Sequence, residues 1–84
     1  MCRQSPAMQY ISRKIEANSR HDIILFIANS PLKKLDKEFC YDLIDGYSYK
    51  ELEIKYNKSA SRIGQWKRTC YEALWKYEYQ QLRK

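Results

Sequence analysis

The stretch that decides the fold is residues 46–63, GYSYKELEIKYNKSASRI. Ser48 followed three residues later by Glu51 is a capping box, in which the serine oxygen accepts a backbone amide of the first turn and the glutamate reaches back to the serine amide. Gly46, just before it, is suited to the left-handed conformation that ends a helix. The pattern therefore predicts one helix ending near Gly46 and a short helix over residues 49–56.

A longer helix follows after only three residues. Asn57 is one of the few non-glycine residues that tolerate a left-handed turn, and Ser59 can cap a helix that starts at Ala60. Apolar side chains then recur at three- and four-residue steps, at Ile63, Trp66, Cys70, Leu74 and Tyr77. We expect this helix to run to about Gln80 and to bury Trp66.

Three further helices are expected upstream. The first starts at Pro6 behind a capping Ser5 and ends near Ala17, the second is capped by Ser19, and the third is capped by Asp36. The expected core residues of these helices, of the link before the third and of the short helix are Met8, Tyr10, Ile11, Ile15, Ile23, Ile24, Phe26, Ile27, Leu32, Leu35, Phe39, Cys40, Leu43, Ile44, Leu52, Ile54 and Tyr56.

Composition agrees with a helical fold. The chain has 84 residues, of which 44% are hydrophobic and 31% charged, and it contains only two glycines and two prolines. This length allows one small domain, and the scarcity of glycine and proline favours long helices. We predict a single all-α domain over residues 1–84, built of about five helices.

The two capped helices joined by Asn57-Lys58-Ser59 have the layout of a helix-turn-helix. Residues 46–52 resemble the "G-x-S-Y-x-E-I" entry of sigma-factor region 4, and residues 59–63 resemble the "S-x-S-x-V" start of its recognition helix. Ala73-Leu74 falls where that family often has "A-L" in its final turn. Glu53 and Lys58 depart from the family pattern, which usually has a small and an apolar residue there.

This resemblance covers about residues 32–77 and extends to small regulators of phages and mobile elements. It implies a helix-turn-helix over residues 48–77, within a segment 32–84 that ends in a long recognition helix. Residues 1–31 form N-terminal helices without a recognised counterpart. Proteins of this type bind duplex DNA, and sigma-region-4 domains also dock onto RNA polymerase.

The charge distribution supports DNA binding independently. The formal net charge is +6. Five basic residues and no acidic residue lie between positions 55 and 68, whereas the rest of the chain has eleven basic and ten acidic residues. Positive charge concentrated on the turn and the recognition helix is suited to the phosphates of a nucleic acid.

Spacing along the last helix then assigns roles. With the apolar stripe turned inward, the base-contacting residues are expected to be Ala60, Ser61, Gln65 and Arg68. Arginine can bind guanine, glutamine can bind adenine, and small side chains can contact a thymine methyl. The residues expected to contact the DNA backbone are Ser48, Tyr49, Lys58, Ser59, Arg62 and Lys67.

The aromatic residues leave two alternatives open. Eight tyrosines and two tryptophans could stack the bases of single-stranded DNA or RNA. Tyr71, Trp75 and Tyr79 point away from the apolar stripe of the last helix, so either the N-terminal helices or a second copy of the chain must cover them. We favour the N-terminal helices slightly, and keep a homodimer as the other reading.

Other classes of protein find little support. Cys2, Cys40 and Cys70 are odd in number and widely spaced, and His21 is the sole histidine, which predicts reduced thiols and neither a zinc site nor another cofactor. Asp42 and Asp45 are expected on a polar helix face. No nucleophile–histidine pair or glycine-rich phosphate loop is present, so we expect no catalytic residues and no enzyme.

The expected location follows from the same residues. The N-terminus has no apolar run of signal-peptide length, and the longest aliphatic stretch, residues 23–28, is far below the ~20 residues of a membrane span. We therefore expect a cytoplasmic protein, associated with the nucleoid when bound to DNA. The sequence as a whole predicts a sequence-specific duplex-DNA-binding regulator, with a polymerase-docking or other protein-docking module as the first alternative and a single-strand binder as the second.

Overall fold

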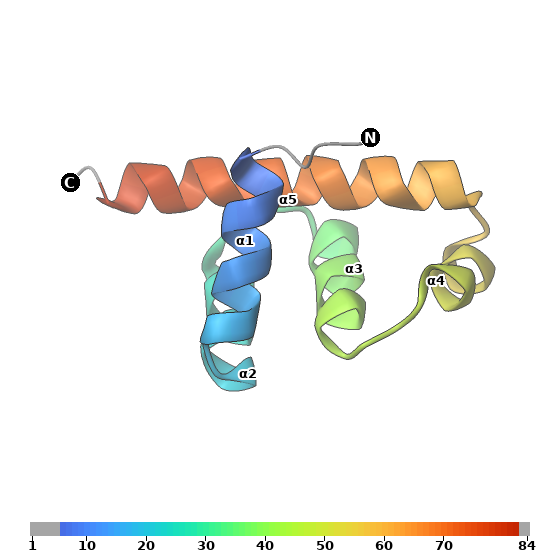
Figure 1. Cartoon of the computed structure of the whole chain (residues 1–84), viewed down its shortest axis with the longest axis horizontal. Helices are drawn as coiled ribbons and strands as arrows, with labels where there is room; N and C mark the ends of the chain where they lie inside the picture. Colours follow the sequence, from blue (N-terminus) through green and yellow to red (C-terminus); the bar gives the residue numbers. More distant parts are fainter. Residues whose placement is uncertain (1–5, 83–84) are drawn as a thin grey trace.

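The computed structural model describes residues 6–82. In this part of the chain there are five helices and no strand, which confirms the all-α prediction: α1 (Pro6–Ala17), α2 (Arg20–Asn29), α3 (Lys34–Ile44), α4 (Tyr49–Tyr56) and α5 (Ala60–Leu82). α5 spans the length of the molecule, and α1 and α3 cross it on one side (Figure 1). α4 packs at the amino-terminal end of α5.

Most of the predicted helix ends are confirmed by backbone geometry and capping bonds. The Ser19 hydroxyl oxygen accepts the Asp22 amide at 3.2 Å. Ser48 and Glu51 form both bonds of the capping box, at 3.1 and 3.2 Å. Gly46 has a φ of +93° at the end of α3, where an L side chain would be strained. Ser5 lies outside the described residues.

Two helix ends differ from the prediction. α3 begins at Lys34, behind Lys33, whose side chain makes no capping bond. Asp36 is therefore in the first turn of α3 and is not its cap. Its carboxylate instead accepts a hydrogen bond from Trp66 of α5. α5 continues past Gln80 to Leu82.

The core joins all five helices. Its buried members are Ile11 of α1, Ile23 and Ile27 of α2, Phe39 and Cys40 of α3, Leu52 of α4, and Ile63, Cys70, Tyr71 and Leu74 of α5. Three residues expected in the core are exposed instead: Tyr10 (40%), Leu35 (53%) and Ile54 (77%). Each has the right chemical type, but its side chain is turned largely toward solvent.

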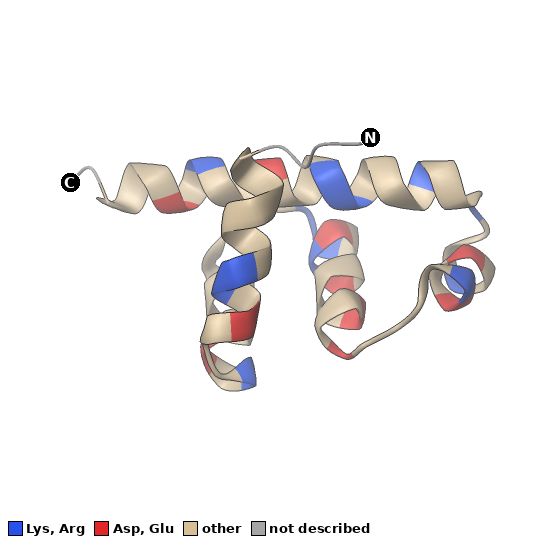
Figure 2. Cartoon of the chain, viewed as in Figure 1, with Lys and Arg blue, Asp and Glu red and all other residues tan. Residues whose placement is uncertain are grey.

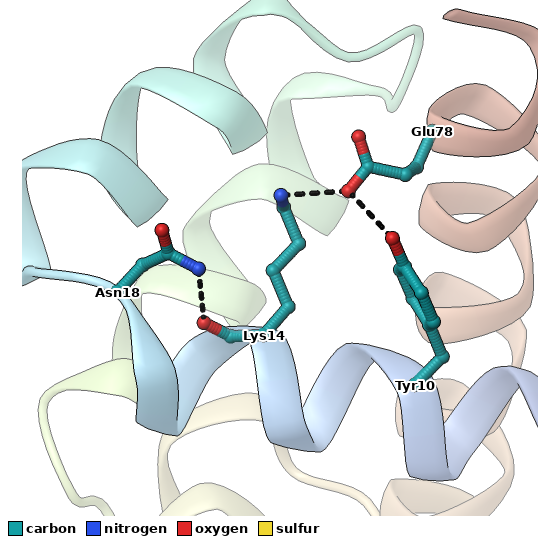
Figure 3. A network of polar contacts seen from close by, with 4 residues as sticks. All are labelled: Tyr10, Lys14, Asn18 and Glu78. Carbon is teal, nitrogen blue, oxygen red and sulfur yellow. Dashed lines mark hydrogen bonds and ion pairs between the residues drawn. The ribbon is translucent and has the colours of Figure 1, made fainter. Parts of the chain in front are cut away.

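The N-terminal helices are joined to the far end of α5 by polar contacts as well as by the core. Lys14 Nζ lies 2.6 Å from Glu78 Oε2, and the Tyr10 hydroxyl donates to the same oxygen at 3.3 Å (Figure 3). Phe26 of α2 packs against Tyr77 with ring centroids 5.6 Å apart. The carboxyl-terminal half of α5 is thus covered by residues of α1 and α2.

Candidate nucleic-acid interface

The turn between α4 and α5 has a left-handed residue at its start. Asn57 has φ 54° and ψ 51°, and its amide donates to the Glu53 carbonyl. The Lys58 amide donates to the same carbonyl at 3.1 Å. The Arg62 amide then donates to the Ser59 hydroxyl at 3.3 Å, at the start of α5. These bonds satisfy backbone groups that helix ends otherwise leave without partners.

Asp42 of α3 holds the carboxyl end of α4 in place. Its Oδ2 accepts hydrogen bonds from Lys55 Nζ at 2.8 Å and from the Tyr56 hydroxyl at 2.5 Å. Burial and the bond to Asp42 raise the pKa of Tyr56 above its ordinary range. Asp42 was expected on a polar helix face, but the residue is only 7% exposed, and the Lys55 and Tyr56 side chains of α4 are bonded to it.

Trp66 holds α5 against α3. Its indole stacks on Phe39 with ring centroids 4.1 Å apart, and its Nε1–H donates to Asp36 at 2.7 Å. The Tyr56 ring meets the same indole edge-on at 4.9 Å. Trp66 is half-buried, and its contacts fix the orientation of the first turns of α5.

The four residues predicted to contact bases, Ala60, Ser61, Gln65 and Arg68, are all exposed. Ser61, Gln65 and Arg68 recur at steps of four and three residues, so they share one face of α5. Arg68 is not free on that face, because its Nε donates to Glu72 Oε1 at 2.9 Å. The Arg68–Glu72 pair is exposed, so it is weak and can rearrange.

The residues predicted to contact the DNA backbone divide into two groups. Ser48 and Tyr49 are exposed at the start of α4, where Glu51 places a carboxylate on the Ser48 amide. Lys67 is half-buried beside them, with its Nζ 5.7 Å from the centre of the Tyr49 ring and 5.5 Å from that of Tyr71. A phosphate at this end of α4 would lie near the Lys67 ammonium and the Glu51 carboxylate.

The second group lies on the α3 side of α5. Ser59, Lys58 and Arg62 are exposed, and the Lys58 ammonium lies 5.6 Å from the centre of the Trp66 ring. A shallow hollow of about 340 Å³ opens here, lined by Leu35, Asp36, Lys58, Arg62, Gln65, Trp66 and Thr69. The hollow brings together two predicted backbone contacts and one predicted base contact.

A larger hollow of about 560 Å³ lies elsewhere, along α1. It is lined by Pro6, Gln9, Tyr10, Arg13, Lys14, Ala17 and Asn18. None of the residues predicted for DNA contact belongs to it. Three of its lining residues, Tyr10, Lys14 and Asn18, belong to the polar network that joins α1 to Glu78 of α5 (Figure 3).

The charge pattern is clearest on α5. Figure 2 shows basic residues without acidic ones along the half of α5 that follows α4, and acidic residues on α3. Two of the five basic residues between positions 55 and 68 are already paired, because Lys55 is bonded to Asp42 and Arg68 to Glu72. The cations left at the surface are Lys58 and Arg62, with Arg68 in its exposed pair and Lys67 over the two tyrosine rings.

The aromatic stripe predicted on the outer side of α5 is partly covered. Tyr71 is 5% exposed, and burial raises its pKa above the ordinary range. Trp75 is half-buried and packs against Tyr79, which is 51% exposed. Tyr71 therefore belongs to the core and is not available to a second copy of the chain.

Sequence reasoning missed three acidic residues that shape this interface: Asp36, Asp42 and Glu72. All three act through partners on α4 or α5. The Arg68–Glu72 spacing of four residues is a recognisable signal for an ion pair on a helix. The other two depend on how the helices cross, for which the sequence has no local signal.

Comparison of the chain with protein-family models, with curated proteins and with solved structures found no match. The likeness to sigma-factor region 4 therefore stays a prediction. Within residues 6–82, no helix has both the length and the apolar character needed to cross a membrane.

Proposed function

We propose that this chain binds duplex DNA in a sequence-specific manner, with α5 as the recognition helix, and regulates transcription in a phage, a mobile element or a bacterial operon. One observation carries the proposal: a short capped helix, a three-residue turn and a long helix whose first turns expose both base-reading and cationic side chains. No chemical reaction is part of this function. The protein acts in the cytoplasm, associated with the nucleoid while it is bound.

The dimensions of the exposed face fit a major groove. Ser61 and Arg68 are seven residues apart, which is about 10 Å along the helix axis. An α-helix with its side chains is about 10–12 Å in diameter, which fits a major groove about 12 Å wide. Arg68 supplies the donors that guanine accepts, and Gln65 supplies the donor and acceptor that adenine pairs with. Base reading is thus assigned to Ala60, Ser61, Gln65 and Arg68.

Backbone contacts are assigned to the residues on either side of this face. Lys58 and Arg62 line the hollow on the α3 side, with Ser59 between them in the chain, and Lys67 lies over the Tyr49 ring on the α4 side. A recognition helix in the groove brings phosphates to both sides. These residues hold the duplex without reading its sequence.

Duplex DNA is favoured over a single strand by the arrangement of the tyrosines. The most exposed ones in residues 6–82 are Tyr10, Tyr47, Tyr49 and Tyr79, and they come from α1, the α3–α4 link, α4 and α5. Stacking of successive bases needs neighbouring rings along one groove. Rings distributed over four segments are less suited to that task.

The decisive experiment is selection of bound sites from a random duplex library, followed by gel shifts with the selected duplex, an unrelated duplex and single strands of both sequences. We expect an enriched motif and binding of the selected duplex ahead of the others. Equal affinity for every duplex would mean that the chain binds the phosphates of DNA without recognising its bases. Preference for the single strands would replace this function with single-strand binding.

Protein docking is the second candidate, and the exposed apolar residue on α4 favours it. Ile54 is 77% exposed on the side of α4 away from the core, where a partner such as RNA polymerase could cover it. Ile54→Ser should leave DNA binding unchanged and abolish capture of polymerase subunits. If wild type and variant capture the subunits equally, this second function is wrong.

A further inference from the structure

The reading face of α5 carries a carboxylate next to its arginine. Glu72 lies one turn beyond Arg68, and their pair joins Nε to Oε1 at 2.9 Å. The two side chains are 66% and 43% exposed. Because an arginine ends in two further amino groups, a bond made through Nε leaves Nη1 and Nη2 to face outward together.

That pair of amino groups is what guanine requires. Guanine presents two acceptors, O6 and N7, to the major groove, and an arginine binds both at once when its planar end is correctly turned. A free arginine side chain has many rotamers and loses that freedom on binding. A carboxylate that already holds Nε reduces this loss.

We propose that Glu72 is a positioning residue for base reading: it orients the Arg68 guanidinium toward guanine and, through its negative charge, weakens binding to unrelated sequences. This inference rests on the proposed DNA-binding function. In water the pair is weak, but it strengthens when the duplex excludes water from the groove. On an unrelated sequence there is no guanine for Arg68 to bind. The repulsion between the Glu72 carboxylate and the DNA phosphates is then not offset, so binding is weaker.

Removing the Glu72 carboxylate should change two measured quantities in opposite directions, which distinguishes a positioning role from a merely structural one. Removing the carboxylate should raise affinity for unrelated duplexes, since a negative charge leaves the DNA-facing surface. It should also lower the preference for the selected site, since the arginine is no longer held. Loss of folded structure would lower both affinities together.

The experiment uses the full chain and three 20-base-pair duplexes: the site selected by wild type, the same site with its guanine contact replaced by adenine, and an unrelated sequence. Binding is measured by fluorescence anisotropy for wild type, Glu72→Ala, Glu72→Gln, Arg68→Ala and the Arg68→Ala/Glu72→Ala double variant. Glu16→Gln is the matched control. It removes the same charge from an exposed residue of α1, on a helix with no predicted DNA contact.

We expect Glu72→Ala to raise affinity for the unrelated duplex by ~3-fold. We expect it also to lower by ~10-fold the ratio of the affinity for the selected duplex to the affinity for the adenine-substituted duplex, which is within the range of one bidentate contact. In the Arg68→Ala background the same change should move that ratio by less than ~2-fold, because the arginine through which it acts is gone. Glu72→Gln keeps an oxygen for Nε, so it should raise unrelated binding and retain most of the preference. Glu16→Gln should leave the ratio unchanged.

The inference is wrong if Glu72→Ala leaves the ratio of the two affinities unchanged. It is also wrong if Glu72→Ala lowers that ratio equally in the wild-type and the Arg68→Ala backgrounds. In both cases wild type still selects a site, so the proposed function stands. If wild type enriches no site and binds no duplex, the proposed function fails first, and the role of Glu72 fails with it.

Discussion

The indole of Trp66 on α5 donates a hydrogen bond to the Asp36 carboxylate on α3 at 2.7 Å, while its ring lies flat on Phe39. One side chain thus joins the two helices by a polar and an apolar contact at the point where α5 begins to expose its reading face. The direction in which that face points depends on this contact.

Replacing Trp66 should therefore reduce the free energy of unfolding in two separable steps. Trp66→Phe keeps the stack but leaves Asp36 without its donor, for a loss of ~1–2 kcal/mol. Trp66→Ala removes both contacts, for a loss of ~3–5 kcal/mol, which is a large part of the stability of so small a protein. Urea denaturation followed by circular dichroism measures the free energy of unfolding of each variant. Equal stability of the two variants would mean that the stack on Phe39 adds nothing beyond the hydrogen bond to Asp36.

The buried tyrosine of α5 should make stability fall at high pH. Burial raises the pKa of Tyr71 above its ordinary value of about 10, so the folded protein keeps a proton that the unfolded chain releases. The folded state then binds more protons, and stability declines as the pH rises above 10, by up to ~1.4 kcal/mol per pH unit from this residue. Urea denaturation between pH 8 and 11 should show a shallower decline for Tyr71→Phe than for wild type, whereas identical slopes would mean that the phenol ionises in the folded state.

Arg68 and Lys58 should differ in how they affect DNA binding. Arg68→Ala should weaken binding to the selected site by ~1–3 kcal/mol and relax the preference at one or two base pairs. Lys58→Ala should weaken selected and unrelated duplexes by similar factors, and reduce the slope of log affinity against log salt by about one. Anisotropy titrations at several salt concentrations test both, and a uniform loss in both variants would exclude base reading by Arg68.

The chain should sediment as a monomer at micromolar concentration in the absence of DNA. Tyr71, one of the three aromatic residues of the predicted dimer surface, is already buried in the core, and a stable interface needs about 800 Å² from each partner. Trp75 and Tyr79 alone offer a smaller surface. A dimer that Trp75→Glu dissociates would contradict this expectation and restore pairing along α5.

Local signals made much of the fold predictable. Ser48, Glu51 and Asn57 determine where α4 begins and ends through bonds within a few residues of one another, and Ser59 does the same for α5. The periodic spacing of Ile63, Cys70 and Leu74 likewise identified the buried side of α5. For the same reason, the exposure of the predicted base-contacting residues followed from spacing alone.

The failed predictions concern contacts between helices. Ile54 and Asp42 have the chemical types of a core and a surface residue, yet the first is 77% exposed and the second 7%. Their burial depends on which part of α4 meets α3, and helix periodicity cannot specify that. Asp36 was assigned to a cap because the nearest predicted partner was its own backbone, whereas its actual partner is 30 residues away.

The contact of α1 with α5 has a consequence for how the protein folds during synthesis. Tyr10 and Glu78 are 68 residues apart in the chain, and contacts of such separation require closure of a long loop. The ribosome releases the N-terminal end first, so the apolar side of α1 has no final partner until α5 has emerged. The α1–α5 contact therefore forms only after α5 has left the ribosome, and until then the apolar side of α1 is exposed to solvent and to chaperones.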